Sequence, residues 1–214
     1  MLIIASYHKT GTVLFQNIWN HYAKSINKLP KQVFTFYDHF NNTSDDYIKN
    51  NKCVVIIRNP YEIIMSGIRY HKKTLEEWCS KKIYINSMTY KEYINSLNKE
   101  DQIMFEMRNI GKLTIDNIYH DIKNRNYNNN VLFIKIEDLY IRSNIKDICL
   151  KIYNHLDKEI QLDKLIESFH INLNINFNRT FFENKYTYQD YFNKKHYIEF
   201  NRIFKKDTMS VLDY

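Results

Sequence analysis

Glycine and proline are scarce in this chain of 214 residues, which has three glycines and two prolines. Neither residue gathers into a linker, and no segment is repeated, so the composition marks no boundary between domains. Hydrophobic residues make up 44% of the chain and can fill a sizeable core. The sequence therefore predicts a single domain over residues 1–214.

Cysteine is also rare, and the three cysteines, Cys53, Cys79 and Cys149, are far apart in the sequence. They form no C-x-x-C pair and no cluster with histidine. These spacings exclude the usual patterns of a zinc site and of a disulfide framework. We therefore expect reduced thiols and no metal ion.

Long apolar runs are missing as well. No segment approaches the length of a membrane span, and the first residues lack a basic stretch followed by a long apolar one. We therefore expect a cytoplasmic protein with no membrane partner.

Basic residues outnumber acidic ones, 31 to 24, which gives a formal net charge of +7. They are spread along the chain instead of forming an arm or a stripe. A diffuse excess of this kind suits an anionic ligand or substrate better than a nucleic-acid duplex. We therefore expect a small-molecule partner and no nucleic acid.

Short apolar runs alternate with amphipathic segments along the chain. Strands are predicted at residues 2–6, 32–37, 53–57 and 131–136, and helices at residues 14–26, 61–70 and 144–156. This order predicts a three-layer α/β fold in which helices flank a central, mainly parallel sheet. Residues 72–125 indicate a mostly helical insertion, and residues 124–130 a loop. Ligands of such sheets bind at the carboxyl ends of the strands, where we expect the site.

One of the three glycines stands at the first strand-to-helix corner, in the sequence YHKTGT. Gly11 would let backbone N–H groups approach an anion closely, and the helix that follows would add its positive end. Lys9 would add a full charge, and Thr10 and Thr12 would add hydroxyl donors. These residues are compatible either with a phosphate cradle or with an ordinary turn beside a solvated lysine. The Walker A pattern, with its second glycine before the lysine, is not present.

A second segment with polar residues follows the third predicted strand and has the sequence RNPYEIIMS. Arg58 stands directly after the strand, where its guanidinium could grip a phosphate with two hydrogen bonds. Pro60 suits the first turn of a helix. Ser66 lies about two turns further on.

Together the two segments resemble the cofactor motifs of the sulfotransferases that use 3′-phosphoadenosine-5′-phosphosulfate (PAPS). The resemblance extends to VLFIKIEDL and ESFHINLN and covers most of the chain, least clearly over 72–125. It implies the P-loop NTPase-like fold of that family, with PAPS as donor and 3′-phosphoadenosine 5′-phosphate (PAP) as product.

The resemblance also implies a set of cofactor contacts. The first segment would hold the 5′-phosphosulfate and the second the 3′-phosphate, while the adenine would lie near Phe169, aided by Phe15. Arg179 would reach the 3′-phosphate as well. The residues implied to bind PAPS are Lys9, Thr10, Gly11, Thr12, Val13, Arg58, Ser66, Phe169 and Arg179.

Sulfuryl transfer to a hydroxyl group requires a base that removes the hydroxyl proton. In the cytosolic branch of the sulfotransferases, this base is a histidine in a loop some twenty residues before the arginine of the 3′-phosphate. His39 occupies that place here, nineteen residues before Arg58. His8 and Asp38 are alternatives. The resemblance thus implies His39 as base and Lys9 as stabiliser of the leaving phosphate, with a small-molecule or glycan acceptor.

Two other functions are compatible with these residues. A P-loop-type kinase could use the same cradle, although no convincing magnesium-binding aspartate is present. A non-catalytic PAP- or nucleotide-binding protein could keep the fold without turnover. Near Trp78, several lysines could bind a sugar or an acidic acceptor, but a core role for this tryptophan is the more common arrangement.

Overall fold

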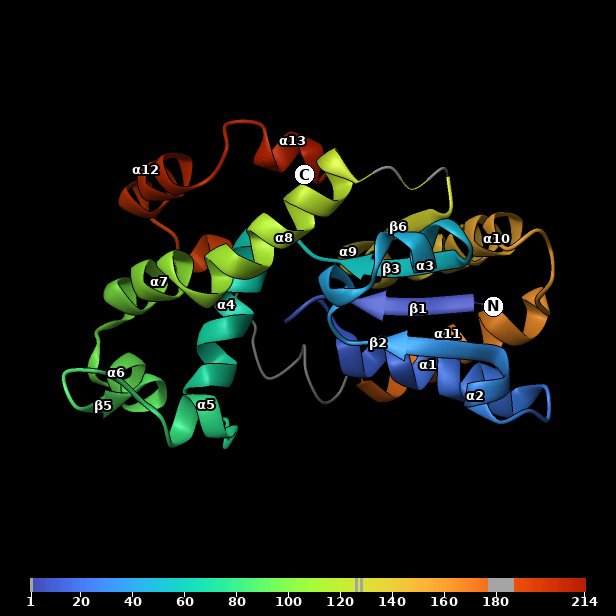
Figure 1. Cartoon of the computed structure of the whole chain (residues 1–214), viewed down its shortest axis with the longest axis horizontal. Coiled ribbons are helices and arrows are strands. Elements are labelled where there is room, and N and C mark those ends of the chain that lie inside the picture. The colour runs from blue at the N-terminus through green and yellow to red at the C-terminus, as the bar shows by residue number, and fades with distance from the viewer. Residues whose placement is uncertain (1, 126, 128, 177–186) are drawn as a thin grey trace. The chain divides into compact units, whose positions relative to one another are not determined.

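The computed structural model describes residues 2–125, 127, 129–176 and 187–214. The chain forms two compact units, each built from two stretches of sequence (Figure 1). The first unit comprises Met1–Arg58 and Lys123–Lys185, and the second comprises Asn59–Ile122 and Tyr186–Tyr214.

A four-stranded parallel sheet forms the centre of the first unit. Its strands are β1 (Leu2–Ser6), β2 (Phe34–Tyr37), β3 (Lys52–Ile57) and β6 (Val131–Lys135), in the spatial order β2-β1-β3-β6. Ala5 is paired with Tyr37 on one side and with Val55 on the other, and Ile57 is paired with Lys135. The carboxyl ends of all four strands therefore lie along one edge.

Helices complete the first unit. They are α1 (Thr12–Ser25), α2 (Pro30–Val33), η1 (Phe40–Asn42), α3 (Asp45–Lys49), α9 (Ile136–Leu139), η2 (Arg142–Asn144), α10 (Ile145–His155) and α11 (Leu162–Asn176). The α/β class and the central parallel sheet flanked by helices were both predicted from the sequence, and the structure confirms them.

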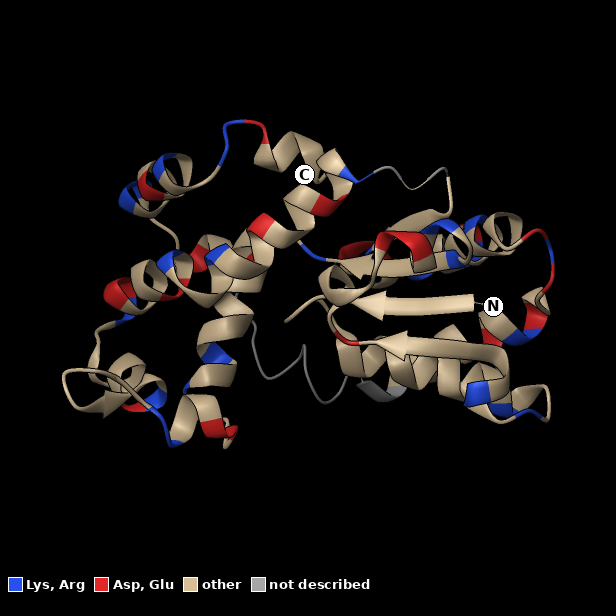
Figure 2. Cartoon of the chain, in the orientation of Figure 1, with Lys and Arg blue, Asp and Glu red and all other residues tan. Residues whose placement is uncertain are grey.

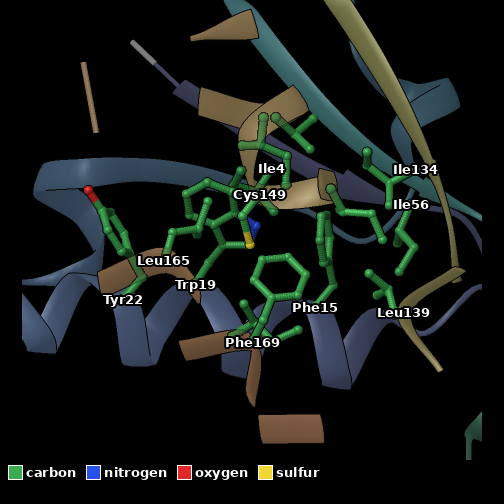
Figure 3. Close-up of a cluster of buried hydrophobic side chains, with 14 of the residues drawn as sticks. Ile4, Phe15, Trp19, Tyr22, Ile56, Ile134, Leu139, Cys149, Leu165 and Phe169 are labelled. Carbon is green, nitrogen blue, oxygen red and sulfur yellow. The ribbon is translucent and has the colours of Figure 1, made fainter. Parts of the chain in front are cut away.

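A large hydrophobic cluster lies on one face of this sheet (Figure 3). Alternate strand residues such as Ile4, Ile56 and Ile134 face the cluster, as the two-residue period of a strand requires. Helix α1 adds Phe15 and Trp19, both with no exposed surface. At about 25 cal/mol per Å² of buried apolar surface, such a cluster is a main source of stability and fixes the position of α1 beneath the sheet.

The second unit is mostly helical. Its elements are α4 (Pro60–His71), α5 (Glu77–Ser80), β4 (Ile83–Ile85), β5 (Met88–Thr89), α6 (Tyr90–Ser96), α7 (Lys99–Arg108), most of α8 (Ile110–Asn124), η4 (Tyr188–Asp190), α12 (Lys194–Ile203) and α13 (Thr208–Val211). A buried glutamate, Glu106 of α7, joins three of the helices. It accepts a hydrogen bond from Tyr90 of α6 and pairs with His71 of α4, each at 2.9 Å. Trp78 is half-buried beside this pair, with its ring 5.3 Å from that of His71.

Two of the predicted strand boundaries were wrong for local reasons. Strand β2 begins at Phe34 and not at residue 32, because Pro30 starts the short helix α2 and the Gln32 side chain accepts a hydrogen bond from Leu29 N–H. Strand β6 ends at Lys135, and Ile136 is the first residue of α9.

Charged residues are scattered over the helices of both units in the view of Figure 2. Among the described residues, no helix combines the length and the apolar character needed to cross a membrane.

Candidate functional site

Three polar segments of the first unit follow parallel strands and so emerge at the same edge of the sheet. Residues 7–11 follow β1, residues 38 and 39 follow β2, and Arg58 follows β3. The turn after β1 leads directly into the amino end of α1, which begins at Thr12.

The turn after β1 has two residues in the left-handed region of backbone conformation. Lys9 has a φ of 63° and Gly11 a φ of 97°. Thr10, which has no exposed surface, holds the turn closed because its hydroxyl accepts a hydrogen bond from Tyr7 N–H and donates one to Tyr7 C=O, both at 2.9 Å. The Thr10 side chain is therefore committed to the turn itself. Left-handed residues near a helix start orient backbone N–H groups towards a common point, which favours an anion.

Gly11 is required by space as well as by conformation. A Cβ atom at this position would lie 2.4 Å from Cδ1 of Ile136, which is itself buried. The turn is thus packed directly onto the residue that follows β6. Only glycine gives the backbone this approach without displacing a core side chain.

Helix α1 begins without a side-chain cap on its amino end, and its first turn contains no acidic residue. The first N–H groups of a helix lack partners inside the helix and carry a partial positive charge. The Thr12 hydroxyl lies 2.9 Å from the Ser6 hydroxyl, which ties the helix start to the end of β1. Val13 is 67% exposed. These features fit an anionic group bound at residues 9–13.

Arg58 lies close to the same turn. Its guanidinium Nη1 donates a hydrogen bond of 3.3 Å to the carbonyl of Lys9, and the residue is only 6% exposed. The structure therefore brings together the lysine and the arginine that were predicted from separate segments. Two basic residues at one strand edge make that edge suitable for a ligand with more than one phosphate or sulfate group.

His8 and His39 also meet at this edge. Their rings stack, with centroids 6.2 Å apart and planes inclined by 11°. His39 and Asp38 are exposed and His8 is half-buried, so all three candidate bases are open to solvent. Tyr37 precedes them, and burial together with Tyr47 raises the pKa of its phenol, which keeps it neutral.

Other predicted site residues lie elsewhere. Phe169 and Phe15 are fully buried in the core cluster of Figure 3, so contact of Phe169 with adenine would require uncovering its ring. Ser66 is half-buried on α4 in the second unit. Arg179 lies outside the described residues.

Ser6 belongs to the site but was not predicted from the sequence. Its side chain has no exposed surface, and its hydroxyl contacts Thr12 and so links β1 to α1. A polar residue at the end of an otherwise apolar strand was the available indication. Within the described ranges, no group of three or more His, Cys, Asp or Glu side chains is arranged to hold a metal ion.

Comparison with solved structures gives a match to the crystal structure of mouse sulfotransferase SULT7A1 complexed with PAP. The TM-score is 0.57 and the sequence identity 15%, and the match covers 97% of this chain and 83% of that one. No protein-family model matches the sequence, and no curated protein matches it. At this identity the match shows a common fold: the chain has the α/β fold of a sulfotransferase.

Proposed function

We propose that this protein is a sulfotransferase that moves the sulfuryl group of PAPS to a hydroxyl of a small-molecule or carbohydrate acceptor. The observation that carries the proposal is the convergence of Lys9, Gly11, Arg58 and His39 at one edge of the sheet. The sulfotransferase fold and the PAP bound in the structural neighbour support it. A single domain and a cytoplasmic location belong to the same proposal.

In this function the turn after β1 holds the 5′ end of PAPS. The backbone N–H groups of residues 11–13 face the phosphosulfate, and Lys9 neutralises the negative charge that grows on the phosphate as the sulfur–oxygen bond breaks. The side chain of Thr10 acts indirectly, because its hydroxyl keeps the turn closed. Sulfuryl transfer thus depends mainly on positioning and charge stabilisation.

Arg58 grips the 3′-phosphate, and its hydrogen bond to the Lys9 carbonyl couples the two ends of the cofactor site. The proposal assigns Ser66 and Arg179 to the same phosphate and Phe169 to the adenine. These three assignments rest on the resemblance of the sequence.

His39 removes the proton of the acceptor hydroxyl while the acceptor oxygen forms its bond to sulfur. PAP leaves with the electron pair of the broken bond, and the proton stays on the imidazole until it passes to water. His39 is favoured over His8 because it is exposed on the loop after β2, whereas His8 is half-buried within the turn. Asp38 is the remaining alternative.

The test is an assay of radiolabelled sulfuryl transfer from PAPS to a panel of phenols, alcohols, sterols and sugars. We expect a labelled product with at least one acceptor class, together with PAP in equal amount, and loss of both in Lys9→Ala. Tight PAP binding with no transfer to any acceptor would favour a non-catalytic binding protein. Consumption of ATP in the presence of magnesium would favour a kinase.

A further inference from the structure

The loop that carries His39 is anchored by the residue that follows it. Phe40 begins η1 and has no exposed surface. Its ring meets Tyr7 edge-on at 5.9 Å and Phe133 of β6 at 6.4 Å. A buried ring that contacts both the turn after β1 and strand β6 fixes the backbone beside it, and that backbone includes His39.

Arg125 packs on this anchor from a distant part of the sequence. The residue lies between α8 and β6, and its guanidinium carbon is 5.7 Å from the centre of the Phe40 ring and 5.6 Å from that of Tyr127. Its side chain is 9% exposed. A guanidinium that lies over two aromatic rings and is largely withdrawn from water adds a cation–π attraction to the packing.

The same guanidinium also binds the end of the loop. Arg125 Nη2 donates a hydrogen bond of 2.6 Å to the carbonyl of Thr43, and Nε donates one of 2.6 Å to Oδ1 of Asp45. Thr43 closes η1, because its N–H donates to the carbonyl of Phe40 at 2.9 Å. One side chain thus contacts the Phe40 ring at the start of the loop and two oxygens at its end.

Lysine could not reproduce this arrangement. The contacts need a planar group that lies over a ring while two of its N–H groups reach separate acceptors, which an ammonium group does not provide. The forked guanidinium of an arginine, with its charge-assisted hydrogen bonds, holds its acceptors in one geometry. The Arg125 guanidinium is therefore suited to hold the neighbouring His39 loop in one position.

We infer that Arg125 is a positioning residue for the general base. It holds residues 40–45 and thereby the direction in which the His39 imidazole faces the acceptor hydroxyl. The inference rests on the proposed function of His39. A misplacement of about 1 Å can cost about a hundredfold in rate, so a loosened loop would slow the reaction without removing any group that touches the substrate.

The experiment compares Arg125→Gln and Arg125→Lys with the wild-type protein. Arg142→Gln serves as matched control, since Arg142 is an exposed arginine of the same unit that bonds Asn174. For each protein we would measure kcat and KM for transfer, PAP affinity by calorimetry, and thermal unfolding. The NMR line width of the His39 imidazole would report its order without turnover.

We expect both Arg125 variants to lose at least about tenfold in kcat and to keep PAP affinity within about twofold. The His39 resonance should change its line width in both variants and stay unchanged in Arg142→Gln. Unchanged kcat in a folded Arg125 variant would overturn the inference. An equal loss of kcat and PAP affinity would also overturn it, because that pattern indicates general damage to the unit.

Two further measurements keep the test decisive. If Arg125→Gln does not fold, Asp45→Asn removes only one partner of the guanidinium and should give a smaller loss of kcat in the same direction. If the wild-type protein binds no PAP and transfers no sulfuryl group, the proposed function fails. The His39 line width then still shows whether Arg125 orders the loop.

Discussion

Gly11 meets two structural requirements of the site. Its left-handed φ allows the turn after β1, and its missing Cβ allows the turn to rest on Ile136. This turn also places the amino end of α1 at the edge of the sheet. The sequence pointed to this residue because glycine is so scarce, but it gave no indication of the contact with Ile136, which is 125 residues away.

Gly11→Ala should therefore damage both stability and binding. A non-glycine residue held in an unfavourable backbone region costs about 1–3 kcal/mol, and here the added methyl group also displaces Ile136. We expect the free energy of unfolding to fall by at least this amount and PAP affinity to fall with it, as measured by denaturant titration and calorimetry. Gln16→Ala, on the exposed side of α1, should change neither. Unaltered PAP affinity in Gly11→Ala would mean that the turn is not the binding element.

The stacked imidazoles of His8 and His39 permit a direct assignment of the base. General-base catalysis contributes about 10²- to 10⁴-fold to a rate, so His39→Ala should lower kcat by about that factor. His8→Ala removes only the ring that stacks on His39 and should cost less. Both variants should bind PAP like the wild-type protein. The opposite order of losses in kcat would transfer the assignment to His8.

Among the secondary-structure elements, the strands with continuous apolar runs were predictable from the sequence. A short hairpin inside a mostly helical segment was not. Strand β1 has the predicted ends, and β3 differs by one residue, because buried parallel strands read as apolar runs. The hairpin of β4 and β5 was missed inside the expected helical insertion. Its turn at Asn86 and Ser87 has left-handed φ values, a conformation that asparagine tolerates but does not require.

The contacts that arrange the site are long-range, which explains why spacing alone could not reveal them. Arg125 meets Thr43 across 82 residues, and His8 meets His39 through the pairing of β1 with β2. Motif spacing predicted Lys9 and Arg58 but not the hydrogen bond between them. Phe169 fitted a family pattern, yet its side chain lies in the core.

Within the second unit, α7 and α12 are joined by an ion-pair cluster that should respond to acid. Glu199 accepts hydrogen bonds from Arg202 at 2.7 and 2.8 Å and from Arg108 at 2.8 Å. The hydrogen bonds from Arg202, with a smaller contribution from Arg108, lower the pKa of this carboxyl from its ordinary value of 4.5 to about 2. A lowered pKa in the folded state adds stability that is present above pH 4.5 and is lost as the pH falls towards 2.

Glu199→Gln should therefore remove part of the acid sensitivity of the protein. The thermal unfolding temperature of the wild-type protein should decrease as the pH is lowered from 4.5 to 2. The unfolding temperature of the variant should decrease less over the same pH range. Thermal unfolding at several pH values measures both curves. Glu159→Gln, at an exposed position, should follow the wild-type protein. Identical slopes for Glu199→Gln and the wild-type protein would show that the cluster does not stabilise the folded state.

Across the protein, the fold and the charge pattern both point to one edge of the sheet. The net charge of +7 is spread over the sequence, while Lys9 and Arg58 converge at one strand edge beside an uncapped helix start. The fold matches that of a sulfotransferase along nearly the whole chain. We propose that this edge binds the adenosine bisphosphate that such a reaction releases.

Binding of PAP at this edge is tested by thermal unfolding with PAP, with ATP and magnesium, and in plain buffer. A ligand at a hundred times its dissociation constant adds about 2.7 kcal/mol, which corresponds to about 5–10 °C for a chain of this size. We expect such a rise with PAP, its loss in Arg58→Ala, and its retention in Arg142→Ala. A rise with ATP and magnesium but none with PAP would show that this edge is not a PAP site and would indicate a kinase.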